Sequence, residues 1–330
     1  MELSIITNAI AGQWHPLDLD KFLGGNEESL VLLARALQLA GVNVEVFTSL
    51  RGPEWISPEG VIYRQRESFD PNEQFDALIS WKDRAVWLQP LAAKFKVHAS
   101  QDVEPAFSTG AMRQIDAFGV LGTYHSERLP WIPEGKRIMI PLGVEPTEYA
   151  PLGQKENLAI YATSPDRGLS TLLEDWGHIR RAHPGLNLLI TYDWTRLATM
   201  SGPQGAMYAR KLEALAAQPG IERVTYDAAG IKGAFQSAKY YVHPIHKIDA
   251  DLFGFGMMKA QACGCIPVLH SADGGFRDSA RMWIPYREWI DGRTEPEANP
   301  RFCQPAVAWT EIVAKYWLPL LNRQEVNHVA

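Results

Sequence analysis

The sequence predicts an α/β protein built from two successive parallel sheets. Three observations support this prediction: short apolar segments alternate with helical patterns, the alternation restarts after a turn-rich segment, and the chain has 330 residues. Strands that alternate with helices are typical of parallel βαβ units. A chain of this length is long enough for two domains of about 150 residues each.

The first half begins with an apolar strand and continues with a long amphipathic helix. This helix is predicted over Ser29–Ala40, where apolar residues recur at helical spacing and Gly41 follows as a suitable C-cap. The strands of this half are predicted at Leu3–Thr7, Val44–Thr48, Ala77–Ser80, Lys96–Ala99, Ala117–Leu121 and Arg137–Ile140.

The turn-rich segment Pro141–Pro151 is predicted to be the linker, and the pattern restarts after it. A helix is predicted over Leu169–Arg180, and an amphipathic helix rich in Trp and Tyr over Ala306–Leu321. The strands of the second half are predicted at Leu158–Ala162, Leu186–Thr191, Val224–Tyr226, Tyr240–His243 and Ile266–His270. We therefore expect two Rossmann-like domains, residues 1–150 and 151–305, and a C-terminal helical segment, residues 306–330.

Composition and charge exclude several other classes of protein. A hydrophobic content of 46% with 21% charged residues is ordinary for a soluble globular protein, and a net charge of −6 provides no basic surface for nucleic acid. The N-terminus runs directly into a strand without a basic leader, and no apolar run is long enough to span a membrane. Three cysteines, two of them in Cys263-Gly-Cys265, fit no disulfide framework, so we expect reduced thiols and a cytoplasmic protein.

The segment Asp251–Leu269 carries the clearest functional pattern. The glycine loop Phe253–Gly256 leads into a predicted helix, and free N–H groups at the positive end of a helix dipole bind phosphate. Asp251, directly before the loop, is placed to hold sugar hydroxyls beside that phosphate. An aspartate at this position is also favoured as a helix cap, and this capping role is compatible with the binding of sugar hydroxyls. Asp249 is an alternative carboxylate, because spacing alone cannot choose between the two.

The same segment resembles the donor-site signature of retaining GT-B glycosyltransferases of family 4, Glu-x-Phe-Gly-x4-Glu-Ala-x-Ala-x-Gly-x-Pro-Val. Asp251 stands for the first Glu, Phe253-Gly254 match, and Lys259 stands where the second Glu is expected. Four further segments resemble family motifs in family order: Leu23–Glu28, Pro141–Glu145, Tyr161–Leu169 and Val307–Glu311. The resemblance implies the GT-B fold, in which two Rossmann-like domains face each other across a cleft and the C-terminal helix crosses back to pack on the first domain.

The resemblance also implies a nucleotide-diphospho-sugar donor in the second domain and a glycan or other soluble hydroxyl acceptor in the first, with no metal and no other cofactor. Arg167 is the expected diphosphate-binding cation, because it lies in a Ser-Pro-Asp-Arg-Gly turn between a strand and a helix. Its structural alternative is a pair with Asp166 or Glu174. Lys232 and Lys247 could assist, although a solvated lysine is the more ordinary role for each.

Several residues of the first domain are further candidates. Gly24-Gly25 precedes a helix and suits either a phosphate contact or a flexible turn. His98 ends a strand, where the resemblance places a histidine against the donor sugar, although a lone histidine is usually a satisfied structural residue. Gln101, Asp102 and Ser126 also follow strands and could line the acceptor pocket or belong to ordinary polar loops.

Lys259 is the main departure from the family pattern. We expect it in the first turn of its helix, where a lysine opposes the helix dipole by roughly 0.3–1 kcal/mol. Lys259 could donate to ribose or phosphate oxygens, could pair with Asp251, or could mark a chain that has lost donor binding.

The sequence therefore predicts a retaining, metal-independent glycosyltransferase of glycan biosynthesis. Two other classes compete with it. A non-catalytic nucleotide-sugar-binding or scaffold homologue is supported by Lys259 alone. An NAD-dependent enzyme is disfavoured because no Gly-x-Gly-x-x-Gly follows the first strand, and Gly24-Gly25 come too late for that turn.

Overall fold

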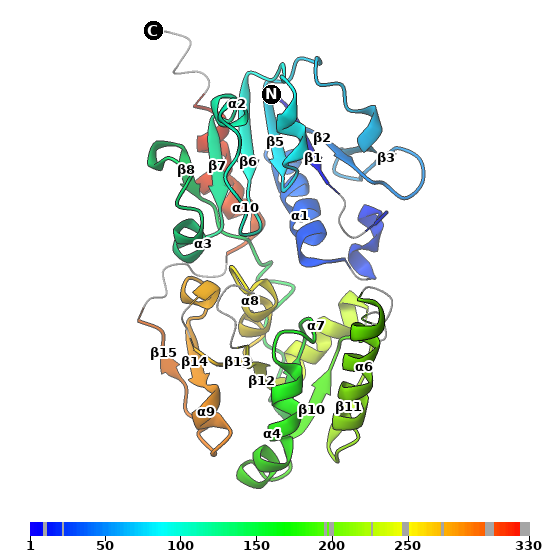
Figure 1. The fold of residues 1–330 in the computed structure, drawn as a ribbon, viewed down its shortest axis with the longest axis vertical. Helices are drawn as coiled ribbons and strands as arrows, with labels where there is room; N and C mark the ends of the chain where they lie inside the picture. The colour runs from blue at the N-terminus through cyan, green and yellow to red at the C-terminus, as the bar shows by residue number, and fades with distance from the viewer. Residues whose placement is uncertain are drawn as a thin grey trace. The chain divides into compact units, whose positions relative to one another are not determined.

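The computed structural model of the chain describes residues 1–8, 12–21, 23–194, 197, 201–225, 227–245, 251–271, 274–300 and 307–323. The chain divides into two compact units (Figure 1). The first unit comprises Met1–Glu145 and Val307–Ala330, and the second comprises Pro146–Ala306. The chain thus passes into the second unit and returns to the first. The boundaries predicted from the sequence, after residues 150 and 305, lie close to these two boundaries, which follow Glu145 and Ala306.

The first unit contains an eight-stranded sheet in the order β3-β4-β2-β1-β5-β6-β7-β8. Its neighbouring strands are parallel, apart from the antiparallel pair β3–β4. Every residue of β5 is buried, as expected for a central strand with both faces covered. The strands are β1 (Glu2–Thr7), β2 (Asn43–Thr48), β3 (Trp55–Ile56), β4 (Ile62–Gln65), β5 (Ala77–Trp81), β6 (Phe95–Ala99), β7 (Ala117–Val120) and β8 (Arg137–Met139).

The helices of the first unit include both N-terminal and C-terminal segments of the chain. The described helices are α1 (Gly25–Leu39), α2 (Thr109–Gln114), α3 (Thr123–Arg128), α10 (Trp309–Ile312) and α11 (Leu318–Leu321). A π-helical segment, Val313–Trp317, connects α10 to α11. Because α10 packs against α1, the C-terminal helical segment, residues 309–321, is part of the first unit's structure (Figure 1).

A glycine in the turn-rich segment allows this C-terminal packing. A Cβ atom on Gly143 would lie 2.9 Å from both Cα and Cγ of Trp309, closer than real Cβ contacts. The next residue, Val144, donates its N–H to the carbonyl of Val307 at 2.9 Å. Trp309 is buried as a result. Gly143 is therefore required by the close approach of the C-terminal segment.

The second unit contains a seven-stranded sheet in the order β11-β10-β9-β12-β13-β14-β15, parallel except for the β14–β15 pair. Its strands are β9 (Glu156–Tyr161), β10 (Asn187–Ile190), β11 (Ile221–Arg223), β12 (Ala238–His243), β13 (Ile266–Leu269), β14 (Met282–Pro285) and β15 (Glu297–Ala298). Its helices include α4 (Leu169–Ala182), α6 (Gly202–Ala216), α7 (Ala228–Ser237), α8 (Phe255–Ala262) and α9 (Tyr286–Trp289). No helix in the described part of the chain is both long enough and apolar enough to cross a bilayer.

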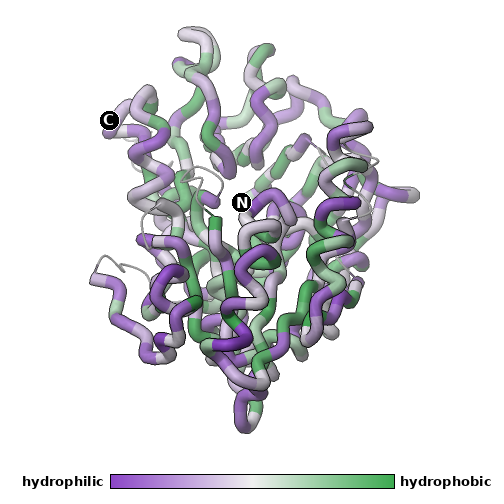
Figure 2. The backbone as a smooth tube through the Cα atoms, turned by 60° about the horizontal axis from the view of Figure 1, so that its bottom comes forward, coloured by the Kyte–Doolittle hydropathy of each residue, from purple (hydrophilic) through white to green (hydrophobic). Residues whose placement is uncertain are grey.

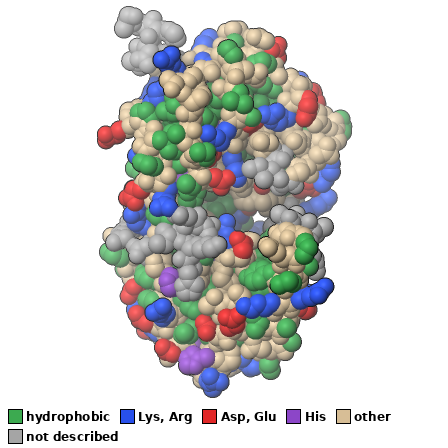
Figure 3. All heavy atoms as spheres, in the orientation of Figure 1, with side chains coloured by type: hydrophobic (Ala, Val, Ile, Leu, Met, Phe, Trp, Pro, Cys, Tyr) green, Lys and Arg blue, Asp and Glu red, His purple; other side chains and the backbone are tan. Residues whose placement is uncertain are grey.

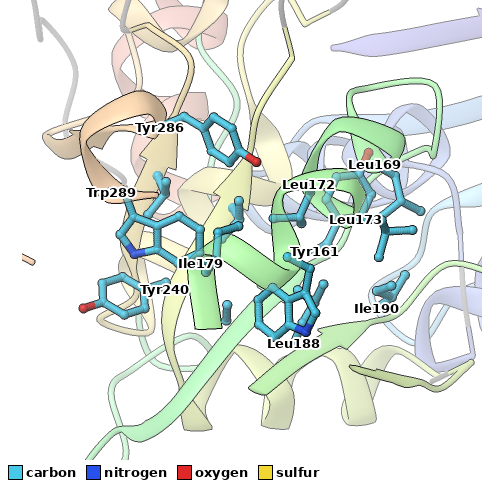
Figure 4. Packing of buried hydrophobic residues seen from close by; sticks show 14 of the residues in the cluster. Tyr161, Leu169, Leu172, Leu173, Ile179, Leu188, Ile190, Tyr240, Tyr286 and Trp289 are labelled. Carbon is cyan, nitrogen blue, oxygen red and sulfur yellow. The ribbon is translucent and has the colours of Figure 1, made fainter. Parts of the chain in front are cut away.

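The core of the second unit forms between its sheet and α4. The buried face of α4 carries Leu169, Leu172, Leu173, Trp176 and Ile179, which recur at helical spacing. These side chains pack with strand residues of the same cluster (Figure 4). In the tube coloured by hydropathy, apolar segments lie toward the interior and polar segments lie toward the outside (Figure 2). Each large side chain buried in this way contributes about 1.5–3 kcal/mol.

The predicted elements are confirmed for most of the chain, with differences at four places. The strand predicted at Val224–Tyr226 is wrong, because the structure has β11 at Ile221–Arg223 and residue 226 lies outside the described residues. The predicted C-terminal helix contains a π-helical segment, and its first residue also lies outside the described part. The β3–β4 hairpin and the strands β14 and β15 were not predicted from the sequence.

Gly143→Ala is expected to destabilise the protein by about 1–3 kcal/mol, because the new methyl group overlaps the backbone and ring of Trp309. Gly135→Ala is the matched control, since a Cβ atom at Gly135 meets nothing within 4 Å. Chemical denaturation of both variants measures the difference. Equal unfolding free energies for the two variants would contradict the packing described for Gly143.

Candidate functional site

Loops that follow three parallel strands meet at one edge of the second unit. A Cβ atom on Gly168, after β9, would lie 2.9 Å from the carbonyl oxygen of Pro244, after β12. A Cβ atom on Gly275, after β13, would overlap the backbone of Asp251 and Phe253. The three loops are therefore in backbone contact at the carboxyl ends of the strands, where open α/β sheets bind their ligands.

Arg167 and Asp251 form an ion pair at this edge. Arg167 Nη1 donates to Asp251 Oδ2 at 2.7 Å, and the side chains are 32% and 16% exposed. The other carboxylate oxygen, Oδ1, accepts the N–H groups of Phe253 at 3.2 Å and Gly254 at 2.6 Å. Asp251 thus both orders the glycine loop and holds the guanidinium group. The structure brings together two predicted site residues that are 84 positions apart.

The local partners considered for Arg167 are engaged elsewhere. Asp166 accepts a hydrogen bond from the hydroxyl of Ser164. Glu174 pairs with Lys211 at 2.7 Å. The structural alternative in which Arg167 caps one of these carboxylates therefore has no support in its described contacts.

The glycine loop leads into the N-terminus of α8. Gly254 is the N-cap, with a left-handed φ of 73°, and a Cβ atom there would lie 2.7 Å from the ring of Phe276. The first N–H groups of a helix have no intrahelical acceptor, so they remain available to a ligand. The side chain of Phe253 is buried in the protein and its N–H is bound to Asp251, so the ligand contact expected of Phe253 stays a prediction.

Lys259 lies in the last turn of α8, which corrects its expected position in the first turn. A cation near the C-terminal end of a helix is favoured by the helix dipole. Its Nζ atom lies 4.2 Å from the ring centre of Phe255 and 5.4 Å from that of Tyr149, and the residue is 9% exposed. Cations are attracted to the faces of aromatic rings. The ion pair that the structure describes for Asp251 is with Arg167. A pair between Lys259 and Asp251, one of the three roles considered for Lys259, is not among the described ion pairs.

His243 is a residue of this edge that the sequence analysis did not select. It ends β12, is fully buried, and its ring lies 4.8 Å from that of Phe276 in an edge-to-face arrangement. Neither ring nitrogen has a hydrogen-bond partner among the residues that the structure describes. Burial lowers the pKa of His243 to about 4; the Asp251 carboxylate opposes this shift to a smaller extent, and the Arg167 guanidinium adds to it. The only sequence signal was a histidine at the carboxyl end of a strand.

His98 is a fully buried residue of the first unit. Its Nδ1 atom lies 3.1 Å from Nε1 of Trp87, an N–H that can only donate, and its Nε2 atom lies 2.9 Å from Oε2 of Glu104. Nδ1 therefore accepts and Nε2 donates, which defines a neutral tautomer. Both nitrogens are satisfied by protein groups. The geometry favours the structural alternative and does not place His98 against a ligand.

The other candidates of the first unit have separate roles. Gly24 is the N-cap of α1, and the Glu27 carboxylate lies against it. Glu27 and Glu28 both lie in the first turn of α1, so two negative charges lie beside the Gly24-Gly25 loop, where a phosphate contact was predicted. Gln101 lines a narrow pocket with Trp81 and Trp309.

Two further candidates of the first unit bind protein groups. Asp102 pairs with Lys82, and Ser126 accepts a hydrogen bond from Arg137 Nη1 at 3.1 Å. Lys232 lies on α7, whereas Lys247 and Asp249 lie outside the described residues.

The comparisons with known proteins identify the fold. No family model and no curated protein matches the sequence. Among solved structures, the chain is similar to a sucrose-phosphate synthase from Thermosynechococcus elongatus, with a TM-score of 0.63 and 14% identity over 99% of this chain and 98% of that one. It is also similar to a glycosyltransferase from Rickettsia africae, with a TM-score of 0.62 and 11% identity over 99% and 97% of the two chains.

A third similar structure is HepE from Anabaena, solved in complex with UDP and glucose. Its TM-score is 0.60, with 11% identity over 100% of this chain and 99% of that one. These matches cover the whole chain and confirm the predicted α/β fold of the GT-B type.

His243 should make stability depend on pH. Its folded-state pKa is about 4 and the ordinary value is 6.5, so below pH 6.5 the unfolded chain binds a proton that the folded protein excludes. Lowering the pH from 7 to 5 should therefore cost the wild type about 2 kcal/mol through this group. His243→Leu should remove that part of the loss, whereas His178→Gln, at a half-exposed position, should retain it. Denaturation at the two pH values measures this, and identical pH dependence in wild type and His243→Leu would contradict it.

Lys259→Glu should destabilise the second unit by about 2–4 kcal/mol, because it buries a carboxylate against two aromatic ring faces. Lys259→Met keeps most of the apolar stem and should cost less. Lys239→Glu is the control, since Lys239 also lies over a ring, that of Tyr240, at a more exposed position. Melting temperatures of the three variants provide the comparison, and a Lys259→Glu variant as stable as wild type would contradict the cation–ring packing.

Proposed function

We propose that the protein is a retaining glycosyltransferase that transfers a sugar from a nucleotide-diphospho-sugar to a hydroxyl group of a glycan or other soluble acceptor. The observation that carries the proposal is the Arg167–Asp251 pair at the N-terminus of α8, on the ligand-binding edge of a GT-B fold. A cation, a carboxylate and free helix N–H groups are the groups that a diphosphate joined to a sugar requires.

The Arg167–Asp251 ion pair suggests how the donor would be recognised. Arg167 holds Asp251 at 2.7 Å, so this carboxylate balances the guanidinium charge. We propose that the donor diphosphate takes over Arg167 and that Asp251 then accepts hydrogen bonds from the sugar hydroxyls. The UDP-glucose complex of HepE, a protein of the same fold, supports a uridine nucleotide as the first donor to test.

The proposed mechanism relies on positioning and charge. In retaining enzymes of this fold, the resemblance implies that the leaving phosphate itself takes the proton of the acceptor hydroxyl. Arg167 and the first turn of α8 would stabilise the negative charge that develops on that phosphate. Asp251 would hold the sugar so that its anomeric carbon faces the acceptor.

A non-catalytic nucleotide-sugar-binding homologue is the second candidate function. The observation in its favour is Lys259, which stands at the family glutamate position and lies against Phe255 and Tyr149. We place this candidate second because Arg167, Asp251 and the glycine loop are assembled at the edge regardless of Lys259.

Metal independence, a cytoplasmic location and the absence of a nucleic-acid partner stay predictions from the sequence. Among the described residues, no group of three or more His, Cys, Asp or Glu side chains is arranged to hold a metal ion. On the face shown in Figure 3, acidic and basic side chains are interspersed.

Calorimetric titration with UDP-, GDP- and ADP-glucose, each with and without EDTA, tests the proposal. Binding of one donor that EDTA does not change, with slow hydrolysis or transfer, is the expected result. Binding without turnover on any acceptor would support the non-catalytic candidate. Binding of none of the three would contradict both candidates.

Arg167→Ala should weaken donor affinity by about 10- to 100-fold, because one charge-assisted contact to the diphosphate is worth about 1.5–3 kcal/mol. Arg223→Ala is the matched control: Arg223 lies in the same unit, pairs with Glu213 at 2.6 Å and is 36% exposed. Asp251→Asn should preserve or increase affinity for UDP while lowering affinity for UDP-glucose, because it frees Arg167 but removes a hydroxyl acceptor. Equal donor affinity in folded wild type and Arg167→Ala would assign Arg167 to structure alone.

A further inference from the structure

His243 is a buried titratable group to which the proposed mechanism assigns no role. It ends β12, it is fully buried, and neither ring nitrogen has a hydrogen-bond partner among the residues that the structure describes. Burying a polar group without a partner costs free energy. An apolar side chain at the same place would avoid this cost, so packing alone does not explain the histidine.

On one side, His243 lies next to the loop that carries Arg167. Gly168 directly follows Arg167, and Pro244 directly follows His243. A Cβ atom on Gly168 would lie 2.9 Å from the carbonyl oxygen of Pro244, so the backbones of the two segments are in contact. A change of charge at the Arg167 loop therefore occurs close to the imidazole.

On the other side, His243 is connected to the Asp251 loop through an aromatic ring. The Phe276 ring lies 4.8 Å from the His243 ring. The same Phe276 ring would lie 2.7 Å from a Cβ atom on Gly254, whose N–H donates to Asp251 at 2.6 Å. The imidazole is thus packed beneath both loops that form the ion pair.

The charges of these loops act on the imidazole. Burial is the main cause of the low pKa of His243, about 4, and three charged groups modify it: Asp251 and Asp166 raise the pKa, whereas Arg167 lowers it. The imidazole is therefore neutral at pH 7, and its proton affinity depends on the charge at the edge.

A donor diphosphate would make the surroundings of His243 more negative. It carries a negative charge on each phosphate, and Arg167 can balance only one of them. An added negative charge favours the protonated form of a neighbouring histidine. The imidazole is already fully buried, so the ligand adds little further desolvation to oppose this effect.

We propose that His243 takes up a proton when the donor binds and so provides a second positive charge beneath the diphosphate. The proton passes from solvent to a ring nitrogen of the neutral imidazole, and no covalent bond of the donor changes in this step. The inference rests on the proposed function, because it requires an anionic donor at this edge. The donor complex then binds more protons than the free protein, so donor affinity must rise as the pH falls.

UDP-glucose is the probe, because its diphosphate is esterified at both ends and does not itself titrate between about pH 5 and pH 7. In an NMR titration, the midpoint of the His243 ring should be higher by about 1–2 pH units in the complex than in the free protein. The affinity measured by calorimetry should then increase about 2- to 10-fold from pH 7 to pH 5, with matching proton uptake in buffers of different ionisation enthalpy.

His243→Leu is the informative variant, because it removes the titrating group and leaves an apolar side chain in the buried position. Its affinity for UDP-glucose should lose the increase at low pH. His270→Gln is the matched control: His270 follows β13 at the same edge and is partly buried, and this variant should retain the increase. Circular dichroism confirms that each protein is folded at both pH values, and the NMR titration of the wild type needs no variant.

The inference and the proposed function fail in different ways. A His243 midpoint that UDP-glucose leaves unchanged, or an increase in affinity that persists in His243→Leu, would overturn the inference while donor binding at pH 7 still supports the proposed function. Absence of binding by UDP-, GDP- and ADP-glucose at both pH values would overturn both.

Discussion

The ion pair between Arg167 and Asp251 is the interaction on which the candidate site depends. It joins the loop after β9 to the loop after β12, and the same carboxylate orders the glycine loop that starts α8. Each of the two charges has the other as its partner, which holds the two loops together. A diphosphate offers Arg167 an anion in place of Asp251, and the released carboxylate can turn to hydroxyl groups.

Close backbone approach is the constraint that lets these loops meet. Gly168 faces Pro244, Gly275 faces the Asp251–Phe253 backbone, and Gly254 faces the Phe276 ring, each at a distance that leaves no room for a side chain. His243 lies beneath the same edge with both nitrogens unsatisfied by described residues. The edge therefore combines a tightly packed backbone with a buried polar group. Burying a polar group without a hydrogen-bond partner is costly.

The parts of the fold that follow from local pattern were predictable, and those that depend on distant residues were not. Apolar strands alternating with helices indicated both sheets, and Asp251 and Arg167 were found through their loops. The surroundings of Lys259 include Tyr149, which no local pattern places beside α8. Likewise, the burial of His98 depends on Glu104 and Trp87, and two-residue strands such as β3 carry too little pattern to detect.

The proposed function depends most on one step, the exchange of Asp251 for the donor diphosphate at Arg167. A crystal structure of the protein with UDP tests this most directly. We expect a diphosphate oxygen within hydrogen-bond distance of the Arg167 guanidinium group and beside the first N–H groups of α8, with the 2.7 Å contact between Arg167 and Asp251 broken or lengthened. A bound nucleotide whose phosphates lie away from Arg167, with the ion pair unchanged, would contradict the claim.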